Sequence, residues 1–159
     1  ALPISGDFAT ASPAEKLDEL LRVDVRGTIL ASWKAVELLR QRPGGGVIIN
    51  MSWDHVHVGM PGLNPQLFAA VKGAVSAFSR SLARSVAPGI RVNIVAPGWI
   101  ETAFGATLDR IARQTIEAST PLARWGSPED VAAAAVFLAS PDASFLTGQT
   151  IFVGGGVVM

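Results

Sequence analysis

The segment GVIINMSWDHVHVGMPGLNPQLFAAVKGAV, residues 46–75, carries the pattern that decides the fold. It starts as a short, nearly continuous apolar run rich in β-branched residues, crosses a turn-rich loop and continues as a helix-forming stretch. A short apolar run of this kind is typical of a strand that is buried on both faces, as in a parallel sheet. We therefore predict a strand over Val47–Met51 and a helix over Pro65–Val86.

The same order of elements recurs on both sides of this segment. On the N-terminal side, SPAE at residues 12–15 is a capping box with proline at the first helical position, which predicts a helix over Pro13–Arg40. On the C-terminal side we predict strands over Arg91–Val95 and Thr150–Val153, with a helix over Pro128–Leu138 between them. Alternating strands and helices indicate an α/β fold in which the three strands are parallel and adjacent.

The composition excludes several classes of protein. With 159 residues, 49% hydrophobic and 16% charged, the chain is long and apolar enough for one domain with a core. It has no cysteine, which excludes disulfides and thiolate catalysis. A net charge of zero argues against a nucleic-acid partner, and no apolar run reaches the ~18 residues that a membrane span needs. Because the N-terminus also lacks signal-peptide features, we expect a cytoplasmic protein.

The predicted helix over Pro65–Val86 has two faces that are suited to packing. One face is a stripe of large apolar residues: Leu67, Val71, Val75, Phe78, Leu82 and Val86. The other is a stripe of small residues: Ala70, Gly73, Ala77 and Ser81. Small residues on one face allow another helix to approach closely, either within the chain or from a second subunit. We favour a subunit interface, and the unpaired edge of a three-stranded sheet also indicates a part of a larger sheet.

Five motifs, in this order, resemble the short-chain dehydrogenase/reductase family. They are GVIINMSW (46–53) for the fifth strand, FAAVK (68–72) for the Tyr-x-x-x-Lys motif, IRVNIVAPGWIET (90–102) for the sixth strand and the nicotinamide loop, RWGSPEDVAAAAVFLAS (124–140) for the last helix, and ASFLTGQTIFVGGG (143–156) for the seventh strand. The resemblance implies an NAD(P)-dependent alcohol/carbonyl oxidoreductase with a doubly wound, parallel Rossmann-type sheet. Residues 1–159 would form a single partial domain, the C-terminal half of that fold.

The glycine-rich turn after the family's first strand has no counterpart in this sequence. That turn brings backbone N–H groups and a helix N-terminus to the pyrophosphate of the cofactor. The glycines at 44–46 precede a predicted strand and those at 154–156 follow one, so neither set opens a helix. The chain is either the C-terminal part of a longer protein or a short product whose sheet a partner completes. We expect NAD or NADP as cofactor, bound incompletely by this chain alone.

The family's four catalytic positions match residues in this chain, but three of the residue types differ. Lys72 stands at the lysine position, whereas Phe68 replaces the tyrosine, Trp53 the serine and Asp24 the asparagine. The resemblance implies that these positions transfer the proton, orient the substrate and bind the ribose. Because phenylalanine has no ionisable proton, the family's usual proton transfer by tyrosine cannot occur at position 68. We therefore expect negligible oxidoreduction even with cofactor supplied.

The resemblance also implies a set of cofactor contacts. Pro97, Gly98, Ile100 and Thr102 match the loop that holds the nicotinamide carboxamide, and Lys72 matches the residue that binds the ribose. The substrate would be a small molecule, and the resemblance implies a homodimer or homotetramer.

Two hypotheses account for the aromatic rings at the catalytic positions. In a degenerate site, Phe68 and Trp53 fill the old substrate cleft, and the chain is a non-catalytic binding or scaffolding homologue that retains the family's oligomer surfaces. In a rebuilt site, WDHVH supplies Asp54, His55 and His57, and one histidine replaces the lost acid. Turnover that vanished in a variant of either histidine would indicate the rebuilt site. We predict no metal here, because no third and fourth ligands are indicated.

Overall fold

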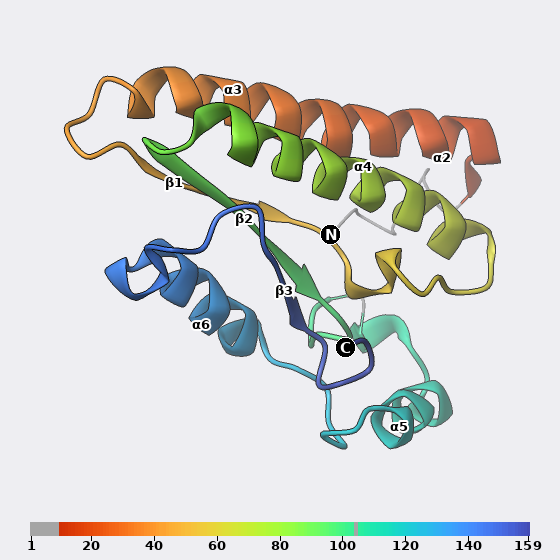
Figure 1. Ribbon diagram of the computed structural model, residues 1–159. Helices are drawn as coiled ribbons and strands as arrows, with labels where there is room; N and C mark the ends of the chain where they lie inside the picture. Colours follow the sequence, from red (N-terminus) through yellow and green to blue (C-terminus); the bar gives the residue numbers. More distant parts are fainter. Residues whose placement is uncertain (1–9, 104) are drawn as a thin grey trace.

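The fold is described from a computed structural model that covers residues 10–103 and 105–159. Its described part contains one sheet of three parallel strands in the order β1-β2-β3 (Figure 1). The strands are β1 (Gly46–Met51), β2 (Ile90–Pro97) and β3 (Thr150–Val153). Each contains the strand predicted at that place, so the predicted α/β class, strand positions and parallel adjacency are confirmed.

Helices connect and flank these strands. In chain order they are α2 (Pro13–Leu20), the π-helical segment η1 (Leu21–Arg26), α3 (Gly27–Leu39), α4 (Leu63–Val86), α5 (Arg110–Ser119) and α6 (Pro128–Ala139), with 3-10 turns η2 (Asp54–Val56), η3 (Gly105–Thr107) and η4 (Pro141–Ala143). The predicted capping box forms at Ser12 with Glu15, and the helix predicted from Pro128 also begins with a capping box, at Ser127 with Asp130. None of the described helices has the length and apolar character needed to cross a membrane.

The structure differs from the predictions at two helices. The helix predicted over Pro13–Arg40 includes a π-helical segment at 21–26, which the hydrophobic pattern did not reveal. Helix α4 begins at Leu63, two residues before the predicted start. Pro65 is tolerated there, because N–H groups in the first turn of a helix have no intrahelical partner to lose.

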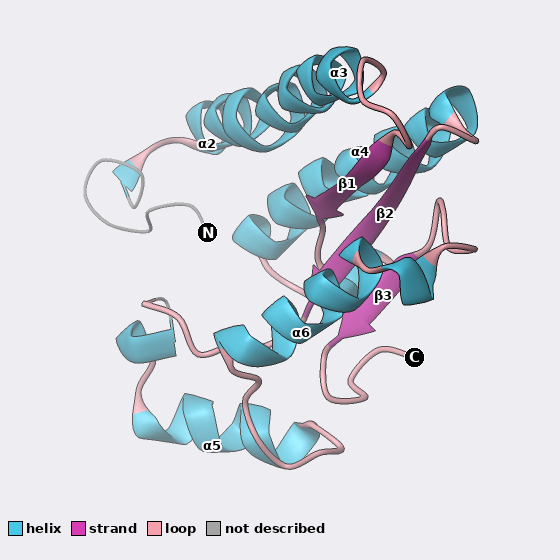
Figure 2. Cartoon of the chain, turned by 90° about the vertical axis from the view of Figure 1, so that its left-hand side faces the viewer, coloured by secondary structure: helices cyan, strands magenta, loops and turns pink. Residues whose placement is uncertain are grey.

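The helices cover the two faces of the sheet. Helices α3 and α4 lie on one face and α6 lies on the other (Figures 1 and 2). Helix α4 packs its large apolar stripe inward, with Val71 and Val75 fully buried. On the other face, Leu138 of α6 packs against Val95 of β2. Apolar burial on both faces explains why the strands are continuous apolar runs rather than alternating ones.

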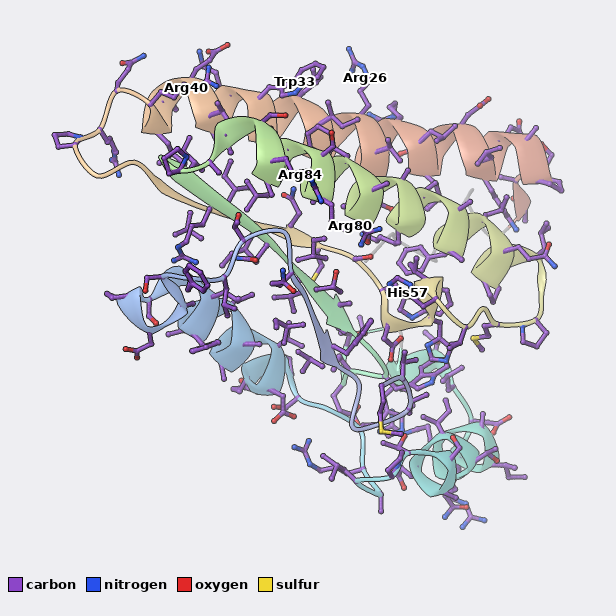
Figure 3. The ribbon with its side chains drawn as sticks, viewed as in Figure 1. Arg26, Trp33, Arg40, His57, Arg80 and Arg84 are labelled. Atoms are coloured by element: carbon purple, nitrogen blue, oxygen red, sulfur yellow. The ribbon has the colours of Figure 1, made fainter. Side chains whose placement is uncertain are left out.

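The outward faces of α3 and α4 remain exposed in this chain. Ala70, Ala77 and Ser81 of the small-residue stripe are exposed, whereas Gly73 is half-buried next to Val56. The three exposed residues therefore do not serve packing within the described part of the chain. Arg26, Trp33 and Arg40 project from the long helix on the side away from the sheet (Figure 3). The subunit interface and the predicted homodimer or homotetramer stay predictions.

Candidate functional site

The site lies where the three parallel strands end. Strand pairing aligns Met51 with Val95 and Pro97 with Val153, so the carboxyl ends of β1, β2 and β3 share one edge of the sheet. The loops that follow these ends carry most of the residues that the sequence singled out. Ligands of α/β proteins bind at this edge of the sheet.

Lys72 and Asp24, two of the predicted catalytic positions, form an ion pair. The Lys72 Nζ donates to Asp24 Oδ1 at 2.8 Å and to the Met51 carbonyl oxygen at 3.5 Å. Asp24 lies in the π-helical segment η1, and wide turns of this type are frequent at functional sites. Lys72 is only 8% exposed, and one of its three N–H donors remains for another partner.

Phe68 and Trp53, which replace the tyrosine and the serine, are also brought together. Their ring centres are 5.2 Å apart, and both side chains are half-buried. The Phe68 ring also faces the Lys72 ammonium, whose Nζ lies 5.3 Å from the ring centre, a cation–π distance. The four predicted catalytic positions therefore form one connected cluster.

Ser52 points away from this cluster. Its Oγ lies 2.6 Å from Ser76 Oγ and donates to the Lys72 carbonyl oxygen at 3.1 Å, so it is buried against α4. This agrees with the alternation of side chains along an extended chain, which places Ser52 and Trp53 on opposite sides. Ser52 is thus a structural residue and does not replace the missing serine.

A second buried polar network links β1 to α3 and α4, the two helices that cover it. The Asn50 side-chain amide donates to Ser79 Oγ at 2.9 Å and to Ser32 Oγ at 3.3 Å. These three residues were not predicted from the sequence, because the partners of a small polar residue on a strand or helix depend on long-range packing. Their satisfied hydrogen bonds support the positions of α3 and α4 around the site.

Asp54 is the most deeply buried charged residue of the site, with a relative exposure of 0%. Its Oδ1 lies 2.6 Å from His55 Nδ1, whereas its Oδ2 has no hydrogen-bond partner within the described residues. A Cβ at Gly98 or Gly154 would collide with this Oδ2, so two glycines from separate loops make room for the carboxyl group. Burial raises the pKa of Asp54, and the His55 contact partly opposes this rise.

The raised pKa predicts a pH-dependent contribution of Asp54 to stability. The folded protein holds the Asp54 proton more tightly than the unfolded chain, where the pKa is near its ordinary value of 3.8. The contribution is therefore fully present below that value and is lost as the pH rises through the folded-state pKa. Asp54→Asn has no carboxyl group to titrate, so the free energy of unfolding of this variant should rise relative to that of the wild type as the pH increases from about 4 through the folded-state pKa of Asp54. Denaturant titrations across this range would test it, and a constant difference would contradict it.

The predicted cofactor loop is firmly held between β3 and the start of α6. The Gly98 N–H donates to the Val153 carbonyl oxygen at 3.0 Å, and the Glu101 N–H donates to the Gly126 carbonyl oxygen at 2.8 Å. Within this loop Pro97, Gly98 and Ile100 are half-buried and Thr102 is exposed. The spare Lys72 donor and this loop are the groups that the resemblance assigns to the nicotinamide end of the cofactor.

The described residues offer no counterpart of the glycine-rich turn for the pyrophosphate. The glycines at 44–46 lead into β1, and those at 154–156 lie in the turn after β3. Neither run opens a helix, as the sequence predicted. Among the described residues, only the groups that the resemblance assigns to the nicotinamide end have a counterpart.

The His57 ring contacts strand β3. It is exposed, and its ring packs edge-on against Phe152 of β3 at 5.6 Å, below the first half of α4 (Figure 3). His55, by contrast, stacks on Trp53 with 4.9 Å between ring centres. Within residues 10–103 and 105–159, no three His, Asp or Glu side chains gather closely enough to hold a metal ion.

Comparisons with known proteins place these observations in a family. A family model described as enoyl-(acyl carrier protein) reductase matches residues 1–158. The pig (Sus scrofa) protein dehydrogenase/reductase SDR family member 4 is 38% identical over 157 residues, which are 97% of this chain and 55% of that protein. The chain spans about half the length of the curated relatives that it matches.

Solved structures agree with this match. A short-chain dehydrogenase/reductase from Brucella melitensis, described as a glucose/ribitol dehydrogenase, superposes with a TM-score of 0.83 at 34% identity, covering 96% of this chain and 60% of that one. A gluconate 5-dehydrogenase from Burkholderia cenocepacia, solved with NADP and tartrate, also gives a TM-score of 0.83, at 31% identity, covering 94% of this chain and 58% of that one.

Proposed function

The chain belongs to the short-chain dehydrogenase/reductase family, and on this premise we propose that it acts in NAD(P)-dependent alcohol/carbonyl interconversion without the family's tyrosine-dependent proton transfer. The observation that carries the proposal is the cluster around Lys72. The lysine is retained and paired with Asp24, but the ring beside it is that of Phe68, which has no proton to give. The site thus keeps the parts that face a cofactor and has lost the usual acid.

The residues of this chain would contact the nicotinamide end of the cofactor. Lys72 would hold the ribose with its spare donor, and the loop containing Pro97, Gly98, Ile100 and Thr102 would hold the carboxamide. A nicotinamide cofactor supplies or accepts a hydride when bound. The solved gluconate 5-dehydrogenase binds NADP, which supports a cofactor of this class without deciding between NAD and NADP.

A second candidate function is that of a non-catalytic homologue. The contact between Trp53 and Phe68, with ring centres 5.2 Å apart, favours it, because two large rings fill space that a substrate would need. The exposed small-residue face of α4 would then serve an assembly. Saturable cofactor binding without any turnover would favour this candidate.

Cofactor binding by the full-length protein tests the proposed function. We expect saturable binding of NAD(H) or NADP(H) by calorimetry. We also expect the variant Lys72→Met/Asp24→Asn, which leaves neither charge unpaired, to weaken binding by about tenfold, the equivalent of 1.4 kcal/mol.

The matched control for this test is Lys34→Met/Glu37→Gln. It removes an exposed ion pair on the outer face of α3 and should leave the affinity unchanged. Absence of binding for both cofactors would contradict the proposal, and equal losses in the two double variants would remove Lys72 from the cofactor site.

A further inference from the structure

The loop after β1 holds a carboxylate and a histidine in direct contact. Asp54 Oδ1 lies 2.6 Å from His55 Nδ1, and the two side chains are 0% and 12% exposed. A carboxylate at Nδ1 fixes which ring nitrogen carries its proton and how the ring is oriented. Because Nδ1 is committed to Asp54, Nε2 is the nitrogen that His55 can offer to an external group.

The His55 ring sits among the positions that have lost the family's catalytic groups. It stacks on Trp53, at an interplanar angle of 20°, and Trp53 in turn contacts Phe68. On another side it meets Trp99 of the predicted cofactor loop edge-on, with ring centres 6.4 Å apart. His55 is thus placed between the former serine and tyrosine positions and the loop expected to hold the nicotinamide.

The burial of Asp54 costs hydration free energy, which is unusual for a residue with a purely structural role. A buried carboxyl group with one unpartnered oxygen loses hydration that a single contact does not restore. Gly98 and Gly154 lie at the ends of two strands, and a side chain at either position would collide with this carboxyl group. A desolvated titratable group in direct contact with a histidine, at the ligand-binding edge of a parallel sheet, is the arrangement expected of a functional pair.

We propose that His55 is the catalytic acid–base residue of this site and that Asp54 is its positioning residue, which deepens the proposed function and rests on it. In the reducing direction, the carbonyl carbon accepts a hydride from a reduced nicotinamide, the π electrons move to the carbonyl oxygen, and that oxygen takes the proton from His55 Nε2. The imidazole regains a proton from water. One carbonyl, one reduced nicotinamide and one proton give one alcohol and one oxidised nicotinamide, and oxidation reverses each transfer.

The first test needs neither cofactor nor turnover. The 159-residue chain has only two histidines, so nitrogen-15 NMR of the imidazole rings of this chain gives two sets of signals, which a His57→Gln variant assigns. We expect neutral His55 to carry its proton on Nδ1, and Asp54→Ala to abolish this preference without changing the His57 signals. If His55 instead showed the same mixture of tautomers as exposed His57, the proposal would be overturned.

The second test compares the two histidines kinetically in the full-length protein. His55→Gln should lower kcat by about 10²–10⁴-fold, the usual contribution of a positioned acid or base, with cofactor affinity unchanged. Asp54→Asn should lower kcat by a smaller factor, and the matched control His57→Gln should leave it unaltered.

The outcomes separate the two proposals. Turnover that survives His55→Gln would overturn the role of His55 and leave the proposed function standing. Tight cofactor binding with no turnover in the wild type would overturn the proposed function in favour of the non-catalytic homologue. Failure to bind either cofactor would overturn the proposed function and this inference together, even if the NMR signals showed the Asp54–His55 pair.

Discussion

Introducing Phe68→Tyr and Trp53→Ser into a full-length protein that also carries His55→Gln is expected to raise kcat by about 10²-fold or more. The His55 variant lacks both acids, so the gain reports the restored tyrosine and serine together. The Lys72 ammonium lies 5.3 Å from the centre of the ring at position 68, and a nearby cation favours the ionised form of a tyrosine. The serine would restore a donor to the substrate oxygen, and such a donor is worth about 3 kcal/mol. Steady-state assays with a panel of alcohols and ketones would measure the gain.

The matched control for this prediction is Phe78→Tyr on the same helix. Phe78 packs against the apolar core under α4 and contacts Trp33, so a hydroxyl there cannot reach the site. The triple variant should gain turnover, whereas Phe78→Tyr in the His55→Gln background should not. If the triple variant bound cofactor but stayed as slow as His55→Gln, position 68 would not lie at the reacting atoms.

Lys72→Met is expected to lower the free energy of unfolding by about 3 kcal/mol, because it leaves the Asp24 carboxylate without a partner. The two side chains are only 11% and 17% exposed, and Asp24 Oδ2 already lacks a hydrogen-bond partner within the described residues. Adding Asp24→Asn removes the charge, so Lys72→Met/Asp24→Asn should recover most of the loss. Urea unfolding followed by circular dichroism and tryptophan fluorescence would measure both variants.

An exposed ion pair provides the control for this cycle. Lys34 and Glu37 are 68% and 62% exposed, and pairs of this kind contribute less than about 1 kcal/mol. Lys34→Met should therefore be nearly neutral. Strictly additive effects of the Lys72 and Asp24 substitutions would show that the two charges are not coupled.

The secondary structure was largely predictable because its signals are local. The strand at Thr150–Val153 has the predicted bounds, and the two helices that begin with a proline start at Pro13 and Pro128, as predicted. The π-helical segment at 21–26 was missed, because an extra residue in one turn changes no composition and little of the apolar pattern. The start of α4 was placed two residues late, because proline is allowed at several positions of a first turn.

The sequence by itself determined which chemistry the inherited site cannot perform. Phe68 lacks an ionisable proton whatever its surroundings, and the order of the motifs identified the positions of Lys72, Trp53 and Asp24.

Only the tertiary structure decided which surroundings Asp54, His55 and His57 have. The three residues lie within four positions of one another and look equivalent in the sequence. Asp54 is buried because Gly98 and Gly154, from loops far along the chain, leave room for its carboxyl group. His55 is fixed by Trp53 and Trp99, whereas His57 faces solvent. Burial and ring contacts arise from long-range packing at the shared edge of three strands, and a local pattern contains no information about that packing.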